Sequence, residues 1–325
     1  MILTITTEQI PQSRQLIEEL DRIKNEGVNI EIRRKAKSNI LLLEDLLKEE
    51  EIRKDLKIET GTKSEGLLSQ TQKELQILLE NEQFHKDQIE ISDDEWLEMK
   101  KELEKEEKGT AEQIEEIQQQ KIKIYRIIVS AFVGTNGDNK RKKAIEVGII
   151  DILLRTFTTL PLDRISPYHA WTFFEITYTN AEVNSLLIKK KALPSIFRLL
   201  DHKDISIVNR SVISIRNILS SSNSSFTDTH PQFEEVEACG GIDKLFEIFK
   251  RNVSKYSKDN ASFCIALLFR TKQIEKEIIA HLISLSFSLD ESLRQLAKQR
   301  LIELSQNKEN KEEIEKRGYI LPEDQ

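Results

Sequence analysis

The residue types that most often carry catalysis or bind metal ions are few and scattered in this sequence. The 325 residues include five histidines and two cysteines, namely His85, His169, His202, His230, His281, Cys239 and Cys264. No two histidines are three or four residues apart, the spacing that places two metal ligands on one face of a helix. Two cysteines cannot form a four-thiolate zinc site or a framework of several disulfides. We therefore expect no metal site.

Residues that could assemble a catalytic or cofactor site are also missing. Residues 134–140 (GTNGDNK) superficially resemble a phosphate-binding loop, but they lack the Lys-Ser/Thr pair and the preceding strand. Cys239 precedes a glycine turn and Cys264 lies in an apolar segment, where cysteine behaves as a small buried hydrophobe. We expect a protein that is not an enzyme, with no catalytic residues, no cofactor and no small-molecule substrate.

The composition predicts a helical protein. Gly occurs only 10 times and Pro only 6 times, while 32% of the residues are charged, so the many turns of a β-sandwich or barrel cannot be supplied. A hydrophobic content of 38% argues against general disorder. The N-terminus lacks the pattern of a secretory signal, and no stretch is apolar enough to span a membrane. We expect no membrane insertion and a cytoplasmic location, with the nucleus as the alternative.

The charge balance argues against a general nucleic-acid binder. Residues 1–125 contain 20 Lys and Arg against 30 Asp and Glu, and residues 126–325 contain 29 against 26. Neither part has the strong basic excess that binds phosphate backbones. Two short basic runs, 140–143 and 189–191, are interpreted as exposed first helices of repeats. We expect a protein or peptide partner, and the oligomeric state is left open.

One pattern recurs along the second half of the chain: a short charged helix, a tight turn and an apolar helix. It occupies residues 144–157, 188–200, 236–250 and 276–287, and a fragment at 314–323 begins it again. Alignment on Ile150, Leu193, Ile242, Ile279 and Ile320 gives spacings, by subtraction, of 43, 49, 37 and 41 residues. Another helix follows each unit, at 166–179, 204–221, 257–271 and 290–306, with Asp204, Ser257 and Asp290 as predicted N-caps. This period is typical of stacked helical repeats.

The units resemble armadillo repeats, and Gly240-Gly241-Ile242 carries the clearest match. Gly148 keeps one glycine of the turn, residues 191–194 keep only a small residue and a proline, and the fourth unit has lost the turn signature. The resemblance implies an all-α, right-handed superhelical solenoid in which the third helix of each repeat lines a concave groove. Glycine suits the turn because the chain must reverse sharply between two helices.

Three regions follow from these patterns. Residues 1–58 form a helical N-terminal region and a candidate divergent repeat, since Ala36, Ile40 and Leu43 fall where a third helix carries its apolar face. Residues 59–110 form a charged helical or linker segment, including a helix at 93–108 with Ser92 and Glu95 as a capping box. Residues 111–325 form the repeat array. We favour exposed helices over a coiled coil for residues 100–121, and we expect the Ser-rich residues 220–232 to be a mobile surface loop.

The armadillo resemblance also implies candidate binding residues. In that family the third helix often carries a Trp and, four residues later, an Asn that grips the backbone of an extended peptide. In this sequence only Trp171 keeps the indole, followed by Glu175, and only Asn217 keeps the amide. Together with Arg210 and Glu303 these residues would form a partner-binding groove of mixed charge. The missing Asn ladder argues against generic capture of basic localisation peptides.

The resulting functional hypothesis is a protein-interaction scaffold that binds a peptide or helical segment in its concave groove. One alternative is an importin-alpha-like transport adaptor or a chaperone cofactor with armadillo architecture. Another is a cytoskeletal or self-assembling structural protein that uses the acidic N-terminal helices for assembly. Fold alone does not identify the partner.

Overall fold

The computed structural model describes residue 18 and residues 90–132, 138–178, 181–221, 228–288 and 290–321, and these residues contain helices and no strand. Apart from residue 18, the predictions for residues 1–89, including Ala36, Ile40 and Leu43, lie outside the described residues. So do the central residues 222–227 of the Ser-rich loop, whose predicted mobility therefore stays a prediction. The proposed boundaries at residues 58 and 110 remain predictions as well.

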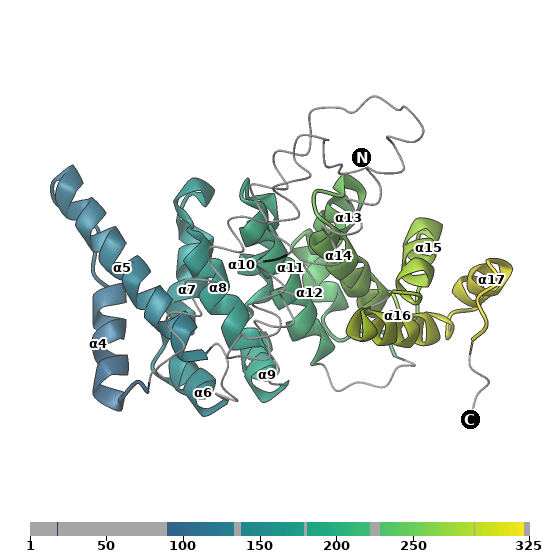
Figure 1. Ribbon diagram of the computed structural model, residues 1–325, viewed down its shortest axis with the longest axis horizontal. Helices are drawn as coiled ribbons and strands as arrows, with labels where there is room; N and C mark the ends of the chain where they lie inside the picture. Colours follow the sequence, from purple (N-terminus) through teal and green to yellow (C-terminus); the bar gives the residue numbers. More distant parts are fainter. Residues whose placement is uncertain are drawn as a thin grey trace. The chain divides into compact units, whose positions relative to one another are not determined.

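The helices are α4 (Asp93–Leu103), α5 (Ala111–Phe132), α6 (Asp138–Glu146), α7 (Ile149–Thr159), α8 (Pro167–Thr177), α9 (Ala181–Lys189), α10 (Leu193–Phe197), α11 (Ile205–Ser220), α12 (Phe233–Ala238), α13 (Gly241–Arg251), α14 (Lys255–Leu268), α15 (Lys276–Leu285), α16 (Glu291–Leu304) and α17 (Lys308–Lys316). Short 3-10 helices at Leu162–Arg164 and Arg198–Asp201 precede α8 and α11. Figure 1 shows this succession of helices along the chain.

The chain divides into two compact units, one of residues 1–97 and 126–140 and one of residues 98–125 and 141–325. In the described part of the first unit, the rings of Trp96 and Phe132 stack with centroids 6.2 Å apart. The predicted capping box is confirmed: the Ser92 backbone N–H donates to Glu95 Oε2 at 2.7 Å, and the Glu95 N–H donates to Ser92 Oγ at 3.3 Å. These bonds satisfy two donors at the start of α4.

The helix predicted at 93–108 is shorter than expected, because α4 ends at Leu103. The chain turns through Gly109, whose φ of 126° is available mainly to glycine, and α5 then starts at Ala111. The Thr110 N–H donates to Gln113 Oε1 at 2.9 Å, and the Gln113 N–H donates to Thr110 Oγ1 at 3.3 Å. A new helix start at this point interrupts the charged run, so residues 100–121 do not form one continuous coiled-coil helix.

In the second unit, each turn between a first and a second helix contains one left-handed residue. These residues are Gly148 with φ 93°, Lys191 with φ 53° and Gly240 with φ 70°. The predicted glycine requirement is confirmed for two turns, while Lys191 adopts the same conformation without being glycine. Gly241 is needed for another reason, since a Cβ there would lie 2.8 Å from the Phe197 ring. The Gly-Gly pair therefore supplies both a positive φ and a close approach between α13 and the preceding repeat.

The fourth unit lacks its short first helix. After α14 ends at Leu268, the chain runs through residues 269–275 without a helix and enters α15 at Lys276. This deletion explains the short spacing of 37 residues between Ile242 and Ile279. The array therefore contains three-helix repeats α6–α7–α8, α9–α10–α11 and α12–α13–α14, followed by the shorter pair α15–α16.

Side-chain caps fix the starts of three long helices. Asp204 accepts from the Ser206 N–H at the start of α11, and Asp290 accepts from Ser292 and Leu293 at the start of α16, as predicted. The predicted cap of α14 was wrong: Ser254 holds that position, with its Oγ accepting from the Ser257 N–H at 3.0 Å. Helix α14 starts earlier because Lys255 and Tyr256 can form its first turn once Ser254 satisfies the backbone donor.

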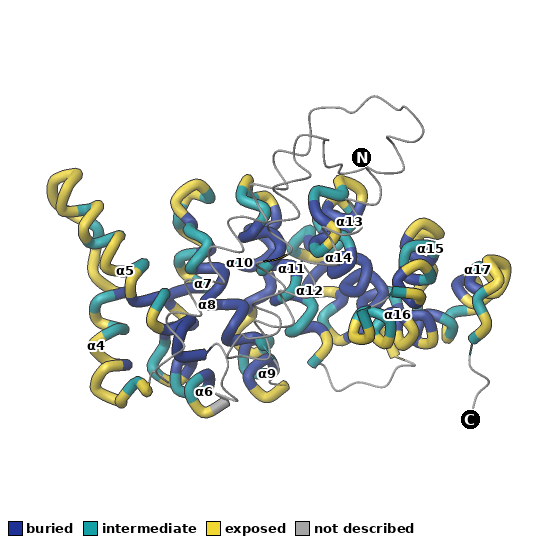
Figure 2. Tube along the Cα trace, in the orientation of Figure 1, coloured by how far each residue is buried: buried dark blue, intermediate teal, exposed yellow. Residues whose placement is uncertain are grey.

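Packing of the third helices builds the core of the second unit. Helix α11 packs against α8 on one side and α14 on the other, and α14 also packs against α13 and α16. The core is apolar and aromatic; for example, Phe157 of α7 meets Phe173 of α8 edge-on at 5.6 Å. Figure 2 shows α8 buried over most of its length. The prediction of an all-α solenoid of armadillo-like repeats is confirmed.

Candidate functional site

Trp171 and Glu175 lie one turn apart on α8 and form a buried pair. The indole Nε1–H donates to Glu175 Oε1 at 2.9 Å. Trp171 is 2% exposed and Glu175 is 0% exposed. The spacing of four residues puts both side chains on one face of the helix, which is why they meet. Glu175 was expected to add negative charge to the groove, but its carboxylate is buried and accepts a hydrogen bond from the neighbouring indole.

Arg210 of α11 joins this pair from the neighbouring repeat. Its guanidinium carbon lies 4.7 Å from the centroid of the Trp171 ring, a cation–π distance. Tyr168 also lies against Trp171, with ring centroids 6.1 Å apart and planes within 11°. Arg210 Nη1 additionally donates to the Ser206 carbonyl at 3.2 Å. The structure therefore brings together three predicted residues, Trp171, Glu175 and Arg210, in one contact between α8 and α11.

Asn217 lies two turns beyond Arg210 on α11 and contacts the end of α8. Its Nδ2 donates to Thr177 Oγ1 at 3.4 Å, and its Oδ1 accepts from Arg216 Nη2 at 3.3 Å. Its backbone carbonyl accepts from Asn184 Nδ2 at 3.3 Å. The Asn217 side chain is partly exposed, and both of its amide hydrogen bonds are long.

Glu303 lies elsewhere in the array, on α16. It is buried and paired with Arg300, and its Oε1 accepts from Gln299 at 3.1 Å. Burial raises the pKa of Glu303, while the Arg300 guanidinium opposes that shift. The structure does not bring Glu303 into the cluster of Trp171, Glu175 and Arg210, and its carboxylate does not face solvent.

The face of α11 that remains accessible is a single stripe. Beyond Ile205, the residues of this helix that are not buried are Arg210, Ile213, Arg216, Asn217 and Ser220, whereas its other residues are buried. We call these five residues the α11 stripe. Their spacing of three or four residues, with Arg216 beside Asn217, places them along one side of the helix. Arg210 and Asn217 were predicted for this face, and Arg216 was missed.

Arg216 connects the stripe to the next third helix. Its Nη1 donates to Asn260 Oδ1 of α14 at 2.6 Å, in addition to its bond with Asn217. Asn260 is 4% exposed and donates its own Nδ2 to the Tyr256 carbonyl at 2.7 Å. A signal for Arg216 was present in the sequence, since it adjoins Asn217, but only the packing of α11 against α14 shows where its side chain goes.

The arginine of the first basic run is not exposed as expected. Arg141 is 2% exposed, and its Nε donates to the Glu175 carbonyl at 2.6 Å. This carbonyl lies in the last turn of α8. Carbonyl oxygens in the last turn of a helix have no N–H partner within the helix, so a positively charged donor is favourable there. Two lysines of the basic runs form ion pairs instead: Lys142 with Glu182 at 2.6 Å and Lys190 with Asp151 at 2.7 Å.

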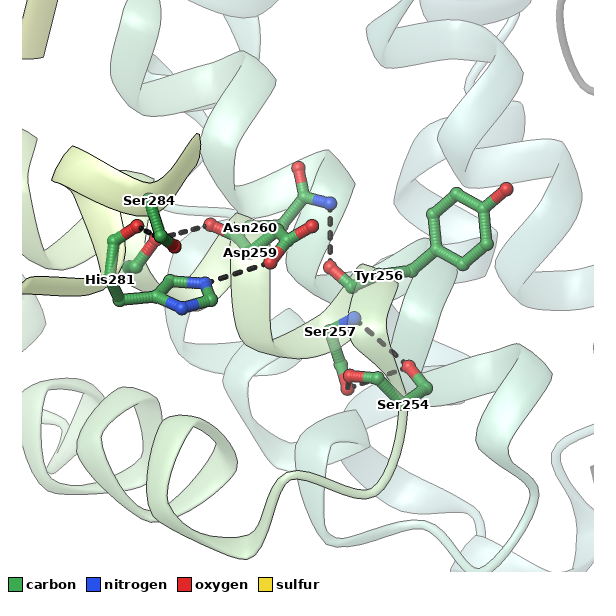
Figure 3. Close-up of polar contacts among 8 residues, drawn as sticks. Ser254, Tyr256, Ser257, Asp259, Asn260, His281 and Ser284 are labelled. Atoms are coloured by element: carbon green, nitrogen blue, oxygen red, sulfur yellow. Dashed lines mark hydrogen bonds and ion pairs between the residues drawn. The ribbon is translucent and has the colours of Figure 1, made fainter. Parts of the chain in front are cut away.

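A cluster of Ser, Asp and His residues links α14 to α15 (Figure 3). His281 Nε2 lies 2.8 Å from Asp259 Oδ1, and the imidazole also meets the Phe249 ring edge-on. The Ser257 hydroxyl bonds within its own turn, to Ser254, rather than to the imidazole. The cluster contains no serine activated by His281, so it acts as a polar contact between helices.

Burial shifts the pKa of two further histidines and of both cysteines. Burial lowers the pKa of His169 and of His230 to about 4, and it raises the pKa of Cys264 to about 12. The pKa of Cys239 is also raised by burial. These shifts favour neutral side chains at neutral pH, the opposite of a reactive thiolate. Within the described part of the chain, no three His, Cys, Asp or Glu side chains are grouped to hold a metal ion.

Comparisons with known proteins address the fold. No protein-family model matches the chain, and no curated protein sequence does. Among solved structures, a designed armadillo repeat protein in complex with the peptide (KR)4 is similar, with a TM-score of 0.50 and 20% sequence identity, over 69% of this chain and 88% of that one. Another designed armadillo repeat protein has a TM-score of 0.49 and 18% identity, covering 69% of this chain and 88% of that one.

A third designed armadillo protein, described as made for modular peptide recognition, has a TM-score of 0.48 and 18% identity, with coverage of 69% and 89%. The similarity at a TM-score of 0.50, together with the repeated three-helix units, shows that this chain has an armadillo-like repeat fold.

Across the described residues, no helix has both the length and the apolar character that crossing a bilayer requires.

Proposed function

We propose that this protein is a non-catalytic scaffold that binds an extended peptide segment of a partner protein along its third helices. The observation that carries the proposal is the α11 stripe, a continuous accessible face on a helix whose other residues beyond Ile205 are buried. The designed armadillo protein that shares the fold was solved with a bound peptide, (KR)4. The same use of the fold supports a peptide ligand here.

The setting of the α11 stripe suits recognition. Helix α11 is held between α8 and α14, and its apolar residues Ile207, Val212 and Ile215 are completely buried. A face that is held in place before binding loses little conformational entropy when a ligand docks. The stripe offers an apolar contact through Ile213 and polar contacts through Asn217 and Arg216, a combination that suits both the side chains and the backbone of a peptide.

The importin-alpha-like adaptor and the chaperone cofactor are narrower versions of the same proposal, and they differ in the partner. The self-assembling structural protein differs in kind, because it predicts a mass that rises with concentration. Light scattering on the intact chain over a wide concentration range separates the two classes. A constant mass supports a scaffold that binds other proteins, and a mass that grows with concentration supports self-assembly.

The direct test selects extended random-sequence peptides against the intact chain and maps the binding site by hydrogen exchange. We expect slower exchange in α8 and α11 when a selected peptide is bound. Because Trp171 is buried, its replacement would disturb folding, so the binding variant should be Ile213→Ala combined with Asn217→Ala. The matched control is Ile242→Ala on α13, which changes a partly exposed isoleucine outside the third helices.

The proposal predicts that the α11 double variant weakens peptide binding about tenfold or more, a loss of about 1.4 kcal/mol, while the control binds as the unmodified protein does. Protection confined to other helices, or equal binding by both variants, would show that the site lies elsewhere.

A further inference from the structure

The accessible face of α11 carries positive charge and no negative charge. Residues Ile205–Ser220 include two arginines, Arg210 and Arg216, and no Asp or Glu. Both arginines belong to the α11 stripe, so the cationic groups lie on the face that the proposed function assigns to the ligand. An interface usually places opposite charges across from each other.

Arg210 already uses the aromatic surface that a cationic peptide would need. Aromatic faces attract guanidinium and ammonium groups, and a Trp ring such as that of Trp171 attracts them more strongly than Tyr or Phe does. In this protein the guanidinium carbon of Arg210 lies 4.7 Å from the Trp171 ring centroid. A lysine or arginine from a ligand would have to displace Arg210 or approach its charge directly. The Trp171 contact therefore disfavours basic side chains.

Arg216 is held by neutral groups. Its two described hydrogen bonds go to the amide oxygens of Asn260 and Asn217, at 2.6 and 3.3 Å. Within the described residues, no carboxylate forms an ion pair with Arg216. Burial lowers the pKa of Arg216, and the nearby Arg300 guanidinium adds to this effect. Both causes disfavour the charged form of Arg216, yet arginine stays protonated in proteins. An anion bound next to Arg216 would therefore offset the free-energy cost of burying its positive charge.

Helices α8, α14 and α16 each carry a buried carboxylate that has another partner. Glu303 pairs with Arg300 on α16, and Asp259, which precedes Asn260 in the sequence, bonds to His281. On α8, Glu175 accepts the indole N–H of Trp171. Each of these acids is buried. None is placed by the structure as an ion-pair partner of Arg216.

We propose that the third-helix site selects acidic peptides, with a ligand Asp or Glu carboxylate bound at Arg216 between α11 and α14. This inference rests on the proposed peptide-binding function and specifies its ligand class. The selectivity is the reverse of that suggested by the (KR)4 ligand of the designed armadillo protein, and the residues responsible are Arg210 and Arg216.

The test compares two peptides of equal length, (DE)4 and (KR)4, labelled with the same fluorophore, in anisotropy titrations of the intact chain. We expect (DE)4 to bind about tenfold or more tightly than (KR)4, with an affinity that falls as salt is added. Arg216→Gln should weaken (DE)4 about tenfold, because it removes the charge while retaining an amide next to Asn260.

Arg251→Gln is the matched control. It makes the same substitution on α13, where Arg251 is exposed and ion-paired with Glu247 at 3.3 Å. Its effect on (DE)4 binding should be less than twofold, since it changes net charge by the same amount away from the site. Circular dichroism of both variants establishes that each remains folded.

Three results would overturn the inference: tighter binding of (KR)4, no binding of (DE)4, or equal losses in Arg216→Gln and Arg251→Gln. The proposed function can survive these results, because it is judged by whether selected random-sequence peptides protect α8 and α11 from exchange. Selected peptides that protect these helices but carry no excess of Asp and Glu would retain the scaffold and reject the acidic ligand.

Discussion

Helices α8 and α11 hold the same place in adjacent repeats, yet they contribute to the protein in different ways. Helix α8 is buried from His169 to Thr177 and contains a buried Trp, a buried Glu and a buried His. Helix α11 buries most of its residues but keeps an accessible stripe with two arginines and an asparagine. Adjacent repeats of one fold therefore have different roles: one third helix mainly stabilises the array, and the next presents a surface.

The strongest test of this division compares Trp171→Ala with Ile213→Ala. Trp171 is 2% exposed, so its truncation should lower the free energy of unfolding by about 3–5 kcal/mol through the cavity and the stranded Glu175 carboxylate. Ile213 is partly exposed, so its truncation should cost only about 1 kcal/mol. Urea denaturation followed by circular dichroism measures both. Equal losses would mean that α8 and α11 do not differ in their structural role.

Acid should destabilise the protein through α8 and not through α11, which contains no histidine. Burial lowers the pKa of His169 from 6.5 to about 4, and its Nδ1 accepts from the Ser166 N–H at 3.0 Å. Because the folded pKa lies below the unfolded one, the stability from neutral His169 is complete above pH 6.5 and is lost as pH falls toward 4. The loss should approach about 3 kcal/mol near pH 4.

The control for this pH effect is His169→Asn, which keeps a side-chain acceptor for the Ser166 N–H. His230 has a similarly lowered pKa and is present in both proteins, so the difference between them isolates His169. Unfolding free energies measured at several values between pH 7 and 4 should converge as the pH falls. A gap that stays constant across this range would show that His169 does not titrate as its burial implies.

A smaller loss of stability is expected when only the hydrogen bond between Trp171 and Glu175 is removed. Trp171→Phe keeps most of the ring but removes the N–H that donates to Glu175 Oε1 at 2.9 Å. The natural control is Trp96→Phe: Trp96 is also buried and stacks on Phe132, and the described structure gives its indole no hydrogen bond. Trp171→Phe should cost about 1–3 kcal/mol more than Trp96→Phe in denaturant unfolding. Equal losses of stability in both variants would show that the Trp171–Glu175 hydrogen bond does not stabilise α8.

The smallest expected change in stability belongs to Asn217→Ala on the α11 stripe. Both amide hydrogen bonds of Asn217 are long, at 3.3 and 3.4 Å, and the side chain is partly exposed. Its replacement should cost less than about 1 kcal/mol of unfolding free energy while weakening the binding of a selected peptide. Calorimetry of unfolding and a peptide titration on the same sample measure both. A large loss of stability with unchanged binding would assign Asn217 to the scaffold.

How much the sequence could predict differs between the fold and the site. The helices, their caps at Asp204 and Asp290, and the glycine turns at Gly148 and Gly240 follow from local chemistry, because a cap or a positive φ depends on neighbouring residues in the chain. Lys191 could not be found in this way, since a lysine has no preference for the left-handed conformation it adopts.

The helical repeat architecture can be predicted from the residue pattern alone, and so can the residues that lie one turn apart on a helix, such as Trp171 and Glu175. Packing between the repeats sets which carboxylates are buried, places Arg210 over Trp171, and brings Arg216 to Asn260 rather than to an acid. Helix periodicity follows from the local chain, whereas the contacts of Arg210 with Trp171 and of Arg216 with Asn260 join residues 39 and 44 positions apart, which meet only when the repeats stack.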